Sequence, residues 1–530
     1  MSNMKKSFLT VVSLMFAAVM LCSCGGKEAA TDKNITVDEN GRKMIGNMYV
    51  EGLPLVKDTV EFTVACEKPS YLTSYSEMPI VREMEKKTNV KINWVELPTD
   101  NFNEKLNLMF ASEEFPDIMW KRVNNNLLTE YGVNGNAIIP LNDLIDEYAP
   151  NWQKWFEKYP NARKIATAPD GNIYSLPSIR DQKSYSSLRD ALFINSEWLD
   201  KLGLEVPKTT EEFKNVLKAF KEQDPNGNGV ADEIPWTFTF GNYVSGEYDM
   251  YSAFGAHMQN NENIMVRAGK VVYVPVTKEF KNAVAYMHEL YAEGLIDPES
   301  FTQNWTQARA KVATENPAIT GFYTAYSYGN NSSKPMLPLK GPDGTQGKVR
   351  SQSNTVTSGM FTIFSKNPYP EISMRWANEW AADGVGVHTL FGPLKESKNG
   401  KYIPSEENSS VQAAPNSMGP FVINDDMISK TLAPEFIAGD VREKLYEFYK
   451  GYVADQSEIY PAVFYTPEQT DEIALYASDI KEYVKKTVAG FITNGGIEEG
   501  WKSYVAQVEK MGLSDLLSIY QEAYDQYNER

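Results

Sequence analysis

The sequence predicts an α/β fold, large enough for two domains or for one bilobed body. The first observation is length, because 530 residues exceed what a single hydrophobic core usually organises. The second is composition: 42% hydrophobic and 12% aromatic residues can fill real cores, while 23% charged residues are ordinary for a soluble globular protein. The third is the alternation of strand-like and helix-like segments from Val60 onward, which is typical of a parallel sheet covered by helices.

The N-terminus has the features of a secretory signal. Two lysines precede an apolar run from Phe8 to Leu21, which is too short to span a membrane comfortably. The motif LCSC, which ends at Cys24, resembles a bacterial lipobox and predicts removal of residues 1–23 and acylation of Cys24. The alternative is an ordinary cleaved signal in which Cys24 is incidental. Residues 24–58 are expected to form a polar tether between the membrane and the folded body.

Cysteine use and net charge narrow the class of protein further. With Cys22 in the signal and Cys24 lipidated, Cys66 has no disulfide partner, and its strand-like surroundings favour a small buried side chain over a reactive thiol. Loss of the signal removes two lysines and no acidic residue, so the net charge changes from −18 to −20. A surface this acidic argues against nucleic acid and anionic lipid as partners.

The first α/β unit begins at Val60. The strand-like runs VEFTVAC and VKINWVEL flank an amphipathic helix, MPIVREMEKKT. A further helix, NFNEKLNLMFAS, precedes the short strand in PDIMW. The order strand, helix, strand, helix, strand, with polar turns between the elements, predicts a parallel sheet.

A second α/β unit follows, and C-terminal helices end the chain. The strand DALFI leads to a short helix that Ser196 is expected to cap and Gly203 to end. Thr209 and Glu212 form a capping box for the next helix, and a similar signal at residues 466–469 opens the C-terminal helices. Residues at helical spacing there, and two tryptophans on another helix, are expected to pack in cores: Ile473, Tyr476, Ile480, Tyr483, Val484, Thr487, Val488 and Phe491, and Trp376 and Trp380.

The stretch KEQDPNGNGVADEIPW, residues 221–236, resembles a calcium loop. Oxygen-bearing side chains alternate with Gly227 and Gly229, which let the backbone curl around a cation. Pro235 stands at the twelfth position, where an EF-hand needs a bidentate glutamate, so Glu233 at the tenth is expected to take that part. The alternative is a surface turn rich in Asn and Gly. The predicted calcium ligands are the side chains of Asp224, Asn226, Asn228, Asp232 and Glu233 and the backbone carbonyl of Val230.

The chain resembles, in four stretches, the extracellular solute-binding lipoproteins that serve sugar importers of the ATP-binding-cassette (ABC) type. The stretches are the lipobox; FINSEWLDKLGLEVPKTTEEF; the run from DPNGNGVADEIP through SAFGAH to FKNAVAYMHELYAEGLIDPESFT; and FITNGGIEEGWKSYVAQVEKMGLSDLLSIYQEAYDQY. Within the family the chain is similar to the subgroup that includes bacterial alginate-binding proteins, whose members show the same spacing around calcium. The resemblance thus implies a structural calcium ion.

The family fold is a two-lobed α/β periplasmic-binding-protein fold, type II-like, with a hinge of several crossing segments and the ligand in the interlobe cleft. The resemblance implies a first lobe of residues 59–176 and 334–428 and a second of residues 177–333 and 429–530. It further implies an oligosaccharide ligand, ABC permease subunits as partners, a monomeric chain, and a lipid anchor on the extracytoplasmic face of the cell membrane. Closure of the lobes by hinge bending is the shared mechanism.

Aromatic side chains are the expected resource for ligand binding. The chain has 30 Tyr, 24 Phe and 10 Trp. An aromatic ring suits the apolar C–H face of a pyranose, whereas the sugar hydroxyls need polar partners. Arg189, just after the first hinge crossing, is expected to hydrogen-bond hydroxyls or a uronate. Burial in a core is the alternative for each candidate. The aromatic candidates lie near a strand end, the calcium loop or the second crossing: Trp120, Trp236, Tyr243, Trp305, Tyr323 and Tyr326.

The sequence favours a binding protein over an enzyme. The three histidines, His257, His288 and His388, show no metal-ligand spacing, and there is no GxSxG elbow, P-loop or GxGxxG opening a helix after a strand. Acidic pairs could serve a glycosidase, but a chain with 70 acidic residues offers such pairs by chance. We therefore predict a non-catalytic protein. The alternatives are a secreted glycosidase or lyase, and a binding protein for peptides or another polar solute.

Overall fold

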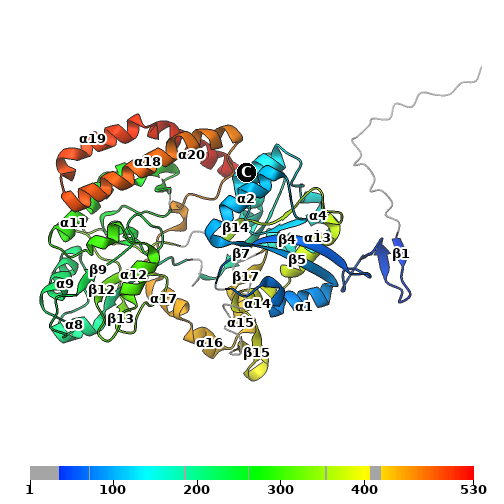
Figure 1. Cartoon of the computed structure of the whole chain (residues 1–530), viewed down its shortest axis with the longest axis horizontal. Coiled ribbons are helices and arrows are strands. Elements are labelled where there is room, and N and C mark those ends of the chain that lie inside the picture. The colour runs from blue at the N-terminus through cyan, green and yellow to red at the C-terminus, as the bar shows by residue number, and fades with distance from the viewer. Residues whose placement is uncertain are drawn as a thin grey trace, which may run out of the picture.

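The computed structural model describes residues 35–70, 72–183, 187–260, 262–351, 355–405 and 419–529. Two separate β-sheets, each covered by helices, form the centres of the two halves of an elongated molecule (Figure 1). We call the half around the six-stranded sheet the first lobe and the half around the four-stranded sheet the second lobe. The predicted α/β fold with two lobes is confirmed. The predicted signal peptide and Cys24 lie outside the described residues.

The sheet of the first lobe has the strand order β17-β7-β14-β6-β4-β5. β4 pairs in parallel with β5 and β6, as the alternation of strands and helices predicts. β14 runs antiparallel to β6 and β7, and β17 pairs in parallel with β7, so the sheet joins segments far apart in the sequence. The strands are β4 (Val60–Lys68), β5 (Val90–Pro98), β6 (Ile118–Trp120), β7 (Leu176–Asp181), β14 (Val356–Ile363) and β17 (Val422–Asn424).

Helices pack on this sheet through buried apolar and aromatic side chains. The indole N–H groups of Trp152 and Trp155 donate to the carbonyl oxygens of Ala377 and Ala381 at 3.3 and 2.7 Å, which docks one helix on another. Trp376 and Trp380 are buried, as predicted, and so is the unpaired Cys66. The helices are α1 (Pro79–Thr88), α2 (Phe102–Ser112), α3 (Asn125–Leu128), α4 (Asn142–Tyr148), α5 (Pro150–Lys158), α6 (Pro160–Ala166), α13 (Pro370–Trp380) and α14 (Val385–Phe391).

Residues 35–58 are folded instead of forming a tether, and the part from Met48 onward packs on the first lobe, whereas Ile35–Val37 are exposed. The strands β1 (Ile35–Val37), β2 (Lys43–Ile45) and β3 (Met48–Tyr49) form an antiparallel sheet. Leu55 and Val56 follow and are fully buried in the core of the first lobe. The predicted tether of residues 24–58 is therefore wrong from residue 35 onward, because this stretch carries enough apolar side chains to dock.

The sheet of the second lobe has the strand order β13-β8-β12-β9. β8 runs antiparallel to β12 and β13, whereas β9 is parallel to β12. The capping box of Thr209 and Glu212 is confirmed, but Asn195 rather than Ser196 caps the preceding helix, because the Asn195 side chain accepts from the Trp198 N–H. The elements are β8 (Ala191–Asn195), β9 (Ile234–Trp236), β10 (Ile264–Arg267), β11 (Lys270–Tyr273), β12 (Thr320–Ala325), β13 (Ser333–Pro335), α8 (Ser196–Leu202), α9 (Thr210–Glu222), α10 (Tyr248–Tyr251), α11 (Lys278–Ala292) and α12 (Trp305–Val312).

Three C-terminal helices cover the second lobe (Figure 1): α18 (Pro467–Asn494), α19 (Ile497–Lys510) and α20 (Leu513–Glu529). The predicted capping box opens α18, and its predicted stripe is confirmed, since Ile480, Val484 and Val488 are buried in the core of this lobe. Within the part of the chain that the structure describes, no helix is both long enough and apolar enough to cross a membrane.

The chain passes between the two sheets at three places. It runs from β7 to β8, from β13 to β14, and from β17 through α15 (Asp425–Thr431) and α16 (Pro434–Gly439) to α17 (Val441–Tyr449). The first crossing follows Asp181, a few residues later than predicted, because β7 extends the first sheet that far. The second crossing lies beyond Val349 rather than at Ser333, because β13 pairs with β8 and Met336, Leu339 and Val349 are buried in the core of the second lobe.

Candidate ligand-binding cleft

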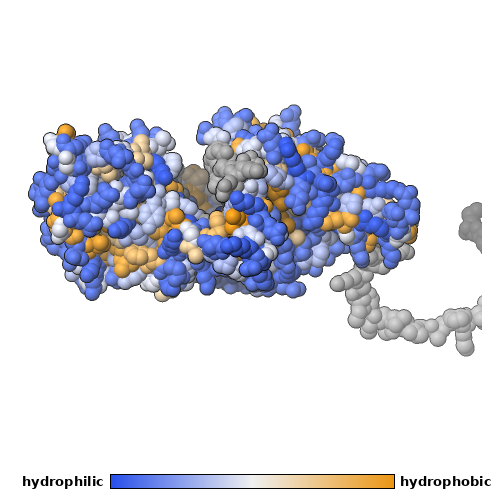
Figure 2. Space-filling model, turned by 90° about the horizontal axis from the view of Figure 1, so that it is seen from below, coloured by the Kyte–Doolittle hydropathy of each residue, from blue (hydrophilic) through white to orange (hydrophobic). Residues whose placement is uncertain are grey.

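In each lobe, one edge of the sheet lies next to the hinge. These two edges can present ligand-binding groups. In the second lobe, Ala325 at the end of β12 pairs with Ala191 at the start of β8, so the neighbouring residues Asp190 and Tyr326 lie at one edge. In the first lobe, β7 ends at Asp181, and the chain runs from there directly to β8. The two edges therefore meet at the same crossing, and Figure 2 shows the surface hollowed between the lobes. Open α/β sheets bind ligands at such edges.

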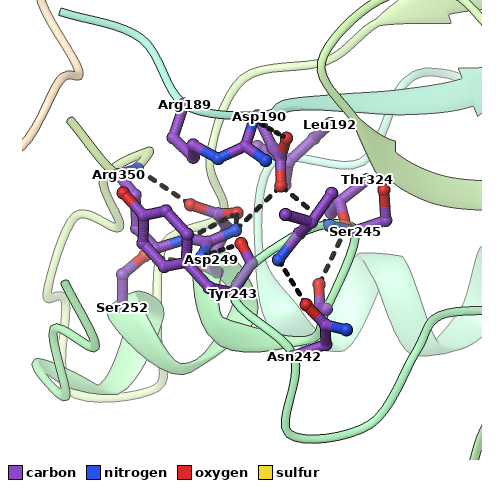
Figure 3. Close-up of polar contacts among 12 residues, drawn as sticks. Arg189, Asp190, Leu192, Asn242, Tyr243, Ser245, Asp249, Ser252, Thr324 and Arg350 are labelled. Atoms are coloured by element: carbon purple, nitrogen blue, oxygen red, sulfur yellow. Dashed lines mark hydrogen bonds and ion pairs between the residues drawn. The ribbon is translucent and has the colours of Figure 1, made fainter. Parts of the chain in front are cut away.

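Two buried carboxylates and a buried arginine form the foundation of the second-lobe edge (Figure 3). The Arg350 guanidinium donates to Asp249 at 2.9 and 3.1 Å and to Asp190 at 3.0 Å. All three side chains are almost fully buried, so the ion pairs are shielded from water. Arg350 also donates to the carbonyl oxygen of Tyr243 at 2.6 Å, which ties the loop that contains Tyr243 to these buried charges.

Arg189 lies above this foundation, among tyrosine rings. Its guanidinium donates to Asp190 at 3.1 Å and lies 5.3 Å from the ring centre of Tyr243 and 5.8 Å from that of Tyr326. A further guanidinium, that of Arg442, lies 3.8 Å from the Tyr326 ring. Cation–π contact of this kind fixes a ring and a cation relative to each other. The structure thus brings together three of the seven predicted ligand-binding residues.

The loop from Thr239 to Glu247 holds Tyr243 in place. Thr239 N–H donates to the Ser245 carbonyl, and Ser245 N–H donates to Asp190 Oδ2, both at 3.0 Å. The Thr324 hydroxyl on β12 donates to the Gly246 carbonyl at 2.8 Å. Gly246 has no room for a side chain, because a Cβ would lie 2.1 Å from the Asn242 carbonyl oxygen. The loop is therefore closed on itself and fastened to the foundation.

The first-lobe edge carries a second charged group. Glu67 near the end of β4 is buried, with one carboxylate oxygen 3.5 Å from Lys121 Nζ and 3.9 Å from Arg122 Nη2. Burial lowers the pKa of Lys121 to about 8, against the raising effect of Glu67. On the neighbouring strand, Trp94 stacks on Tyr75 with ring centres 4.8 Å apart. Tyr75 is fully buried and Trp94 packs against the core of the first lobe, so the charged groups are what this edge presents.

Three of the other four predicted ligand-binding residues lie in the lobe cores, and the fourth, Trp305, lies beside the loop that holds Tyr243. Trp120, Trp236 and Tyr323 are buried in the lobe cores, with Trp120 packed 4.9 Å from both Trp376 and Trp380. Their strand positions point them into the layer between sheet and helices, so they are not part of the site that we propose below. Trp305 is 47% exposed and lines a recess with Ser245 and Thr324, beside the loop that holds Tyr243.

The predicted calcium loop is drawn together around Asp224 and Asp232. Asp224 accepts from the N–H groups of residues 227, 228 and 229, while Asp232 accepts from the side-chain amides of Asn226 and Asn228. Burial, with the nearby charges of Asp224 and Asp232, raises the pKa of Glu233. One Glu233 carboxylate oxygen is buried without a hydrogen-bond partner. These oxygens fit a hard cation, which would relieve the repulsion among three carboxylates.

Other described residues offer no alternative metal centre. No group of three or more His, Cys, Asp or Glu side chains within the described ranges is placed to hold a metal ion. In the loop, Val230 uses its carbonyl oxygen to accept from the Asp232 N–H at 2.9 Å. Asp224, Asp232 and Glu233 of the loop do not form such a group either, so calcium binding there stays a proposal.

Sequence reasoning missed the buried charges that support the site. Asp190, Asp249 and Arg350 come from segments up to 160 residues apart and meet only in the fold. One local signal existed, since Arg189 and Asp190 directly precede the apolar strand ALFIN, where charged residues mark the strand end. Glu67 and Lys121 gave a similar signal at the ends of β4 and β6.

Comparison with known proteins gives a consistent result. A sequence model of the bacterial extracellular solute-binding proteins matches residues 70–386. The fructooligosaccharide ABC transporter substrate-binding protein FusA of Streptococcus pneumoniae is 32% identical over 539 residues, which cover 98% of each chain. Lipoprotein LipO of Bacillus subtilis is 25% identical over 88% of this chain and 93% of its own length.

Solved structures show the same likeness. FusA of S. pneumoniae in complex with kestose has a TM-score of 0.77 at 31% identity, covering 88% of this chain and 99% of that one. A FusA EF-hand mutant, solved in complex with fructo-nystose, is equally similar. Alginate-binding protein AlgQ2 without calcium ion has a TM-score of 0.69 at 25% identity, covering 90% of this chain and all of its own. The likeness therefore extends over both lobes.

Proposed function

The chain belongs to the bacterial extracellular solute-binding proteins, and we propose that it is the substrate-binding component of an ABC transporter for an oligosaccharide. It would capture the sugar between its lobes and deliver it to the permease subunits. Near full-length similarity to FusA, a substrate-binding protein for fructooligosaccharides, supports this proposal. The names of two relatives, FusA and the polygalacturonan/rhamnogalacturonan-binding protein YtcQ of B. subtilis, describe binding rather than catalysis, which supports a non-catalytic role.

The observation that carries the proposal is the group of Arg189, Tyr243 and Tyr326 at the sheet edge that faces the first lobe. Sugar recognition needs aromatic faces for C–H groups and fixed hydrogen-bond partners for hydroxyls. Arg189 is held by Asp190 before any ligand arrives, so little side-chain freedom remains to be lost on binding. Trp305, exposed beside the same loop, adds an aromatic face within the proposed cleft.

We further propose that the ligand is a neutral oligosaccharide. The buried arginine of the second-lobe edge is already paired with Asp190 and Asp249, and Arg189 shares Asp190. Arg442 donates to the backbone carbonyls of Tyr326 and Leu188. At the first-lobe edge, Lys121 and Arg122 face Glu67. A uronate would have to compete with these internal carboxylates, whereas a neutral sugar needs only hydroxyl contacts.

Calcium and a lipid anchor complete the proposal. The loop of residues 224–233 would hold calcium as a structural ion, which the existence of an EF-hand mutant of FusA supports. It lies just before β9 and stabilises the second lobe rather than contacting the ligand. Acylation of Cys24 would hold the protein at the extracytoplasmic face of the membrane as a monomer, in line with the lipoprotein LipO among its relatives.

Isothermal titration calorimetry against a glycan panel tests the function. The panel holds kestose, nystose, an alginate oligosaccharide and a galacturonan oligosaccharide, with a peptide mixture as the non-sugar arm. We expect heat of binding with at least one neutral oligosaccharide and none with the uronates. Exclusive binding of a peptide would contradict the proposal. Chromatography of each mixture after incubation is the second measurement, and cleaved glycan there would show an enzyme instead.

A further inference from the structure

Glu247 is a buried carboxylate outside the group of residues that we propose to contact the ligand. It directly precedes α10 and is 1% exposed, beneath the loop that carries Tyr243. Both of its carboxylate oxygens accept from the Gly241 N–H, at 3.1 and 3.3 Å, and one also accepts from the Tyr251 hydroxyl at 3.2 Å. Burying a carboxylate costs free energy unless hydrogen bonds offset the cost. The contacts of Glu247 therefore indicate that this residue has a role.

The hydrogen bond from the Gly241 N–H to Glu247 fastens the start of the loop that carries Tyr243. Gly241 has a positive φ of 63°, and the chain turns there before Tyr243. The other end of the loop is held by the buried Asp190 and Thr324, which bond to Ser245 and Gly246. Glu247 therefore fastens the loop at Gly241, and loss of this bond would free the turn that precedes Tyr243.

We propose that Glu247 is a positioning residue for the sugar site, and that its ionised form holds the Tyr243 loop in the arrangement that binds ligand. The proposal rests on the oligosaccharide function inferred above. The ionised carboxylate makes charge-assisted hydrogen bonds to Gly241 and Tyr251, which are about twice as strong as neutral ones. Protonation weakens both bonds and leaves one oxygen as a donor facing a second donor group.

The surroundings of Glu247 allow its carboxylate to bind and release a proton. A small cavity of about 40 Å³ borders Glu247 and has room for water, so a proton can reach the carboxylate. The charged and titratable groups that face Glu247 come from several elements: Arg350 before β14, Tyr248 and Tyr251 of α10, and Lys481 and Lys485 of α18. Burial raises the pKa of Glu247 to about 7, and the hydrogen bonds and Arg350 lower it only in part.

Two effects with opposite pH dependence follow. For ligand affinity, the ionised form is the competent one, so binding tightens as pH rises through about 7. For stability, the folded pKa of about 7 exceeds the ordinary value of 4.5, so the stabilising contribution is fully present below pH 4.5 and is lost as pH rises through 7. If Glu247 only stabilised the fold, ligand affinity and folding stability would change with pH in the same direction.

Calorimetry with the bound oligosaccharide from pH 5.5 to 8.5 tests the first effect. We expect the dissociation constant of the wild type to fall about fivefold across this range, from the difference between charged and neutral hydrogen bonds. Glu247→Gln keeps the size and an acceptor but cannot ionise, so it should bind at every pH as the wild type does at pH 5.5. Glu289→Gln, an exposed carboxylate of α11 in the same lobe, is the matched control and should behave as the wild type. Lys121, with its pKa near 8, is common to all three proteins, so their differences isolate Glu247.

Hydrogen exchange of the ligand-free protein tests the loop without any sugar. After correction for intrinsic exchange rates, residues 239–246 should be more protected at pH 8 than at pH 6 in the wild type, and equally protected at both in Glu247→Gln. Equal pH dependence in the two proteins, in exchange or in affinity, overturns the role of Glu247. Absence of glycan binding by the wild type at every pH would instead overturn the proposed function, while the exchange measurement still decides the loop.

Discussion

At the scale of single residues, two arginines of one cluster have different tasks. Arg350 is buried and bonds to both Asp190 and Asp249, so it supports the fold of the second-lobe edge. Arg189 is 9% exposed, pairs only with Asp190 among the described carboxylates and lies near the rings of Tyr243 and Tyr326, so we propose that it contributes to ligand binding. Substitutions can separate the two tasks.

Arg189→Lys should weaken oligosaccharide binding by about 1–2 kcal/mol, because a lysine keeps the charge but loses the planar guanidinium that faces both rings. Its unfolding midpoint should stay close to that of the wild type. Arg350→Met should instead cost about 3–5 kcal/mol in the free energy of unfolding, since it leaves two buried carboxylates unpaired. Calorimetry and urea denaturation measure the two quantities. Equal loss of stability in both variants would contradict this division.

The sequence could not separate these residues. The position after the calcium loop predicts both Tyr243 and Trp236 as ligand contacts, and the approach to the second crossing predicts both Tyr326 and Tyr323, yet the fold buries Trp236 and Tyr323. Strand ends place side chains on both sides of an edge, and only the three-dimensional neighbours decide which side faces the cleft. Asp190 and Arg350, 160 residues apart, have no sequence relation that predicts their pairing.

At the scale of elements, the loop of residues 224–233 is the segment for which we propose a ligand of its own, a calcium ion. The raised pKa of Glu233 reflects burial and the charges of Asp224 and Asp232. With calcium at about one hundred times its dissociation constant, the folded state should gain about 2.7 kcal/mol. We expect a chelator to lower the unfolding temperature by several degrees, with full recovery after calcium is added.

Glu233→Gln is the variant that tests this loop, because it removes one charge without changing size. Its unfolding temperature in chelator should equal or exceed that of the wild type, since repulsion is relieved, while its gain from calcium should be smaller. Differential scanning calorimetry with and without chelator gives both values. Glu222→Gln, an exposed carboxylate at the end of α9, serves as the control. A wild-type curve that chelator leaves unmoved would argue for a plain surface turn.

Elements with local signals were predicted well. Capping boxes at Thr209 and Thr466, the parallel pairing of β4 with β5, and the buried stripe of α18 follow from spacing within a few turns or strands. The small sheet of residues 35–49 was missed, because its strands are too short to show alternation and their burial depends on distant α13, where Arg375 bonds to Tyr49. Local patterns define helices, whereas docking depends on distant partners.

At the scale of the whole molecule, direct contacts join the lobes in addition to the three crossings. Phe464, which precedes α18, is buried in a cluster of the first lobe that includes Phe102 and Phe110. The Asn125 side chain donates to the Val463 carbonyl at 2.9 Å, and Tyr527 of α20 donates to Asn161 at 2.5 Å. Lobe movement must therefore rotate about these contacts or break them, which limits it to a hinge-like closure.

Small-angle X-ray scattering can measure that closure. A ligand held by both Arg189 and the first-lobe edge favours the state in which the two edges approach, so the radius of gyration should fall when the oligosaccharide is added. The fall should follow the same saturation curve as the calorimetric heat. Arg189→Lys should show the same final radius but need about fivefold to thirtyfold more sugar, because it weakens binding without changing the closed shape. A glycan that releases heat yet leaves the radius unchanged would mean that the sugar is bound by one lobe alone, and hinge closure would not be the basis of capture.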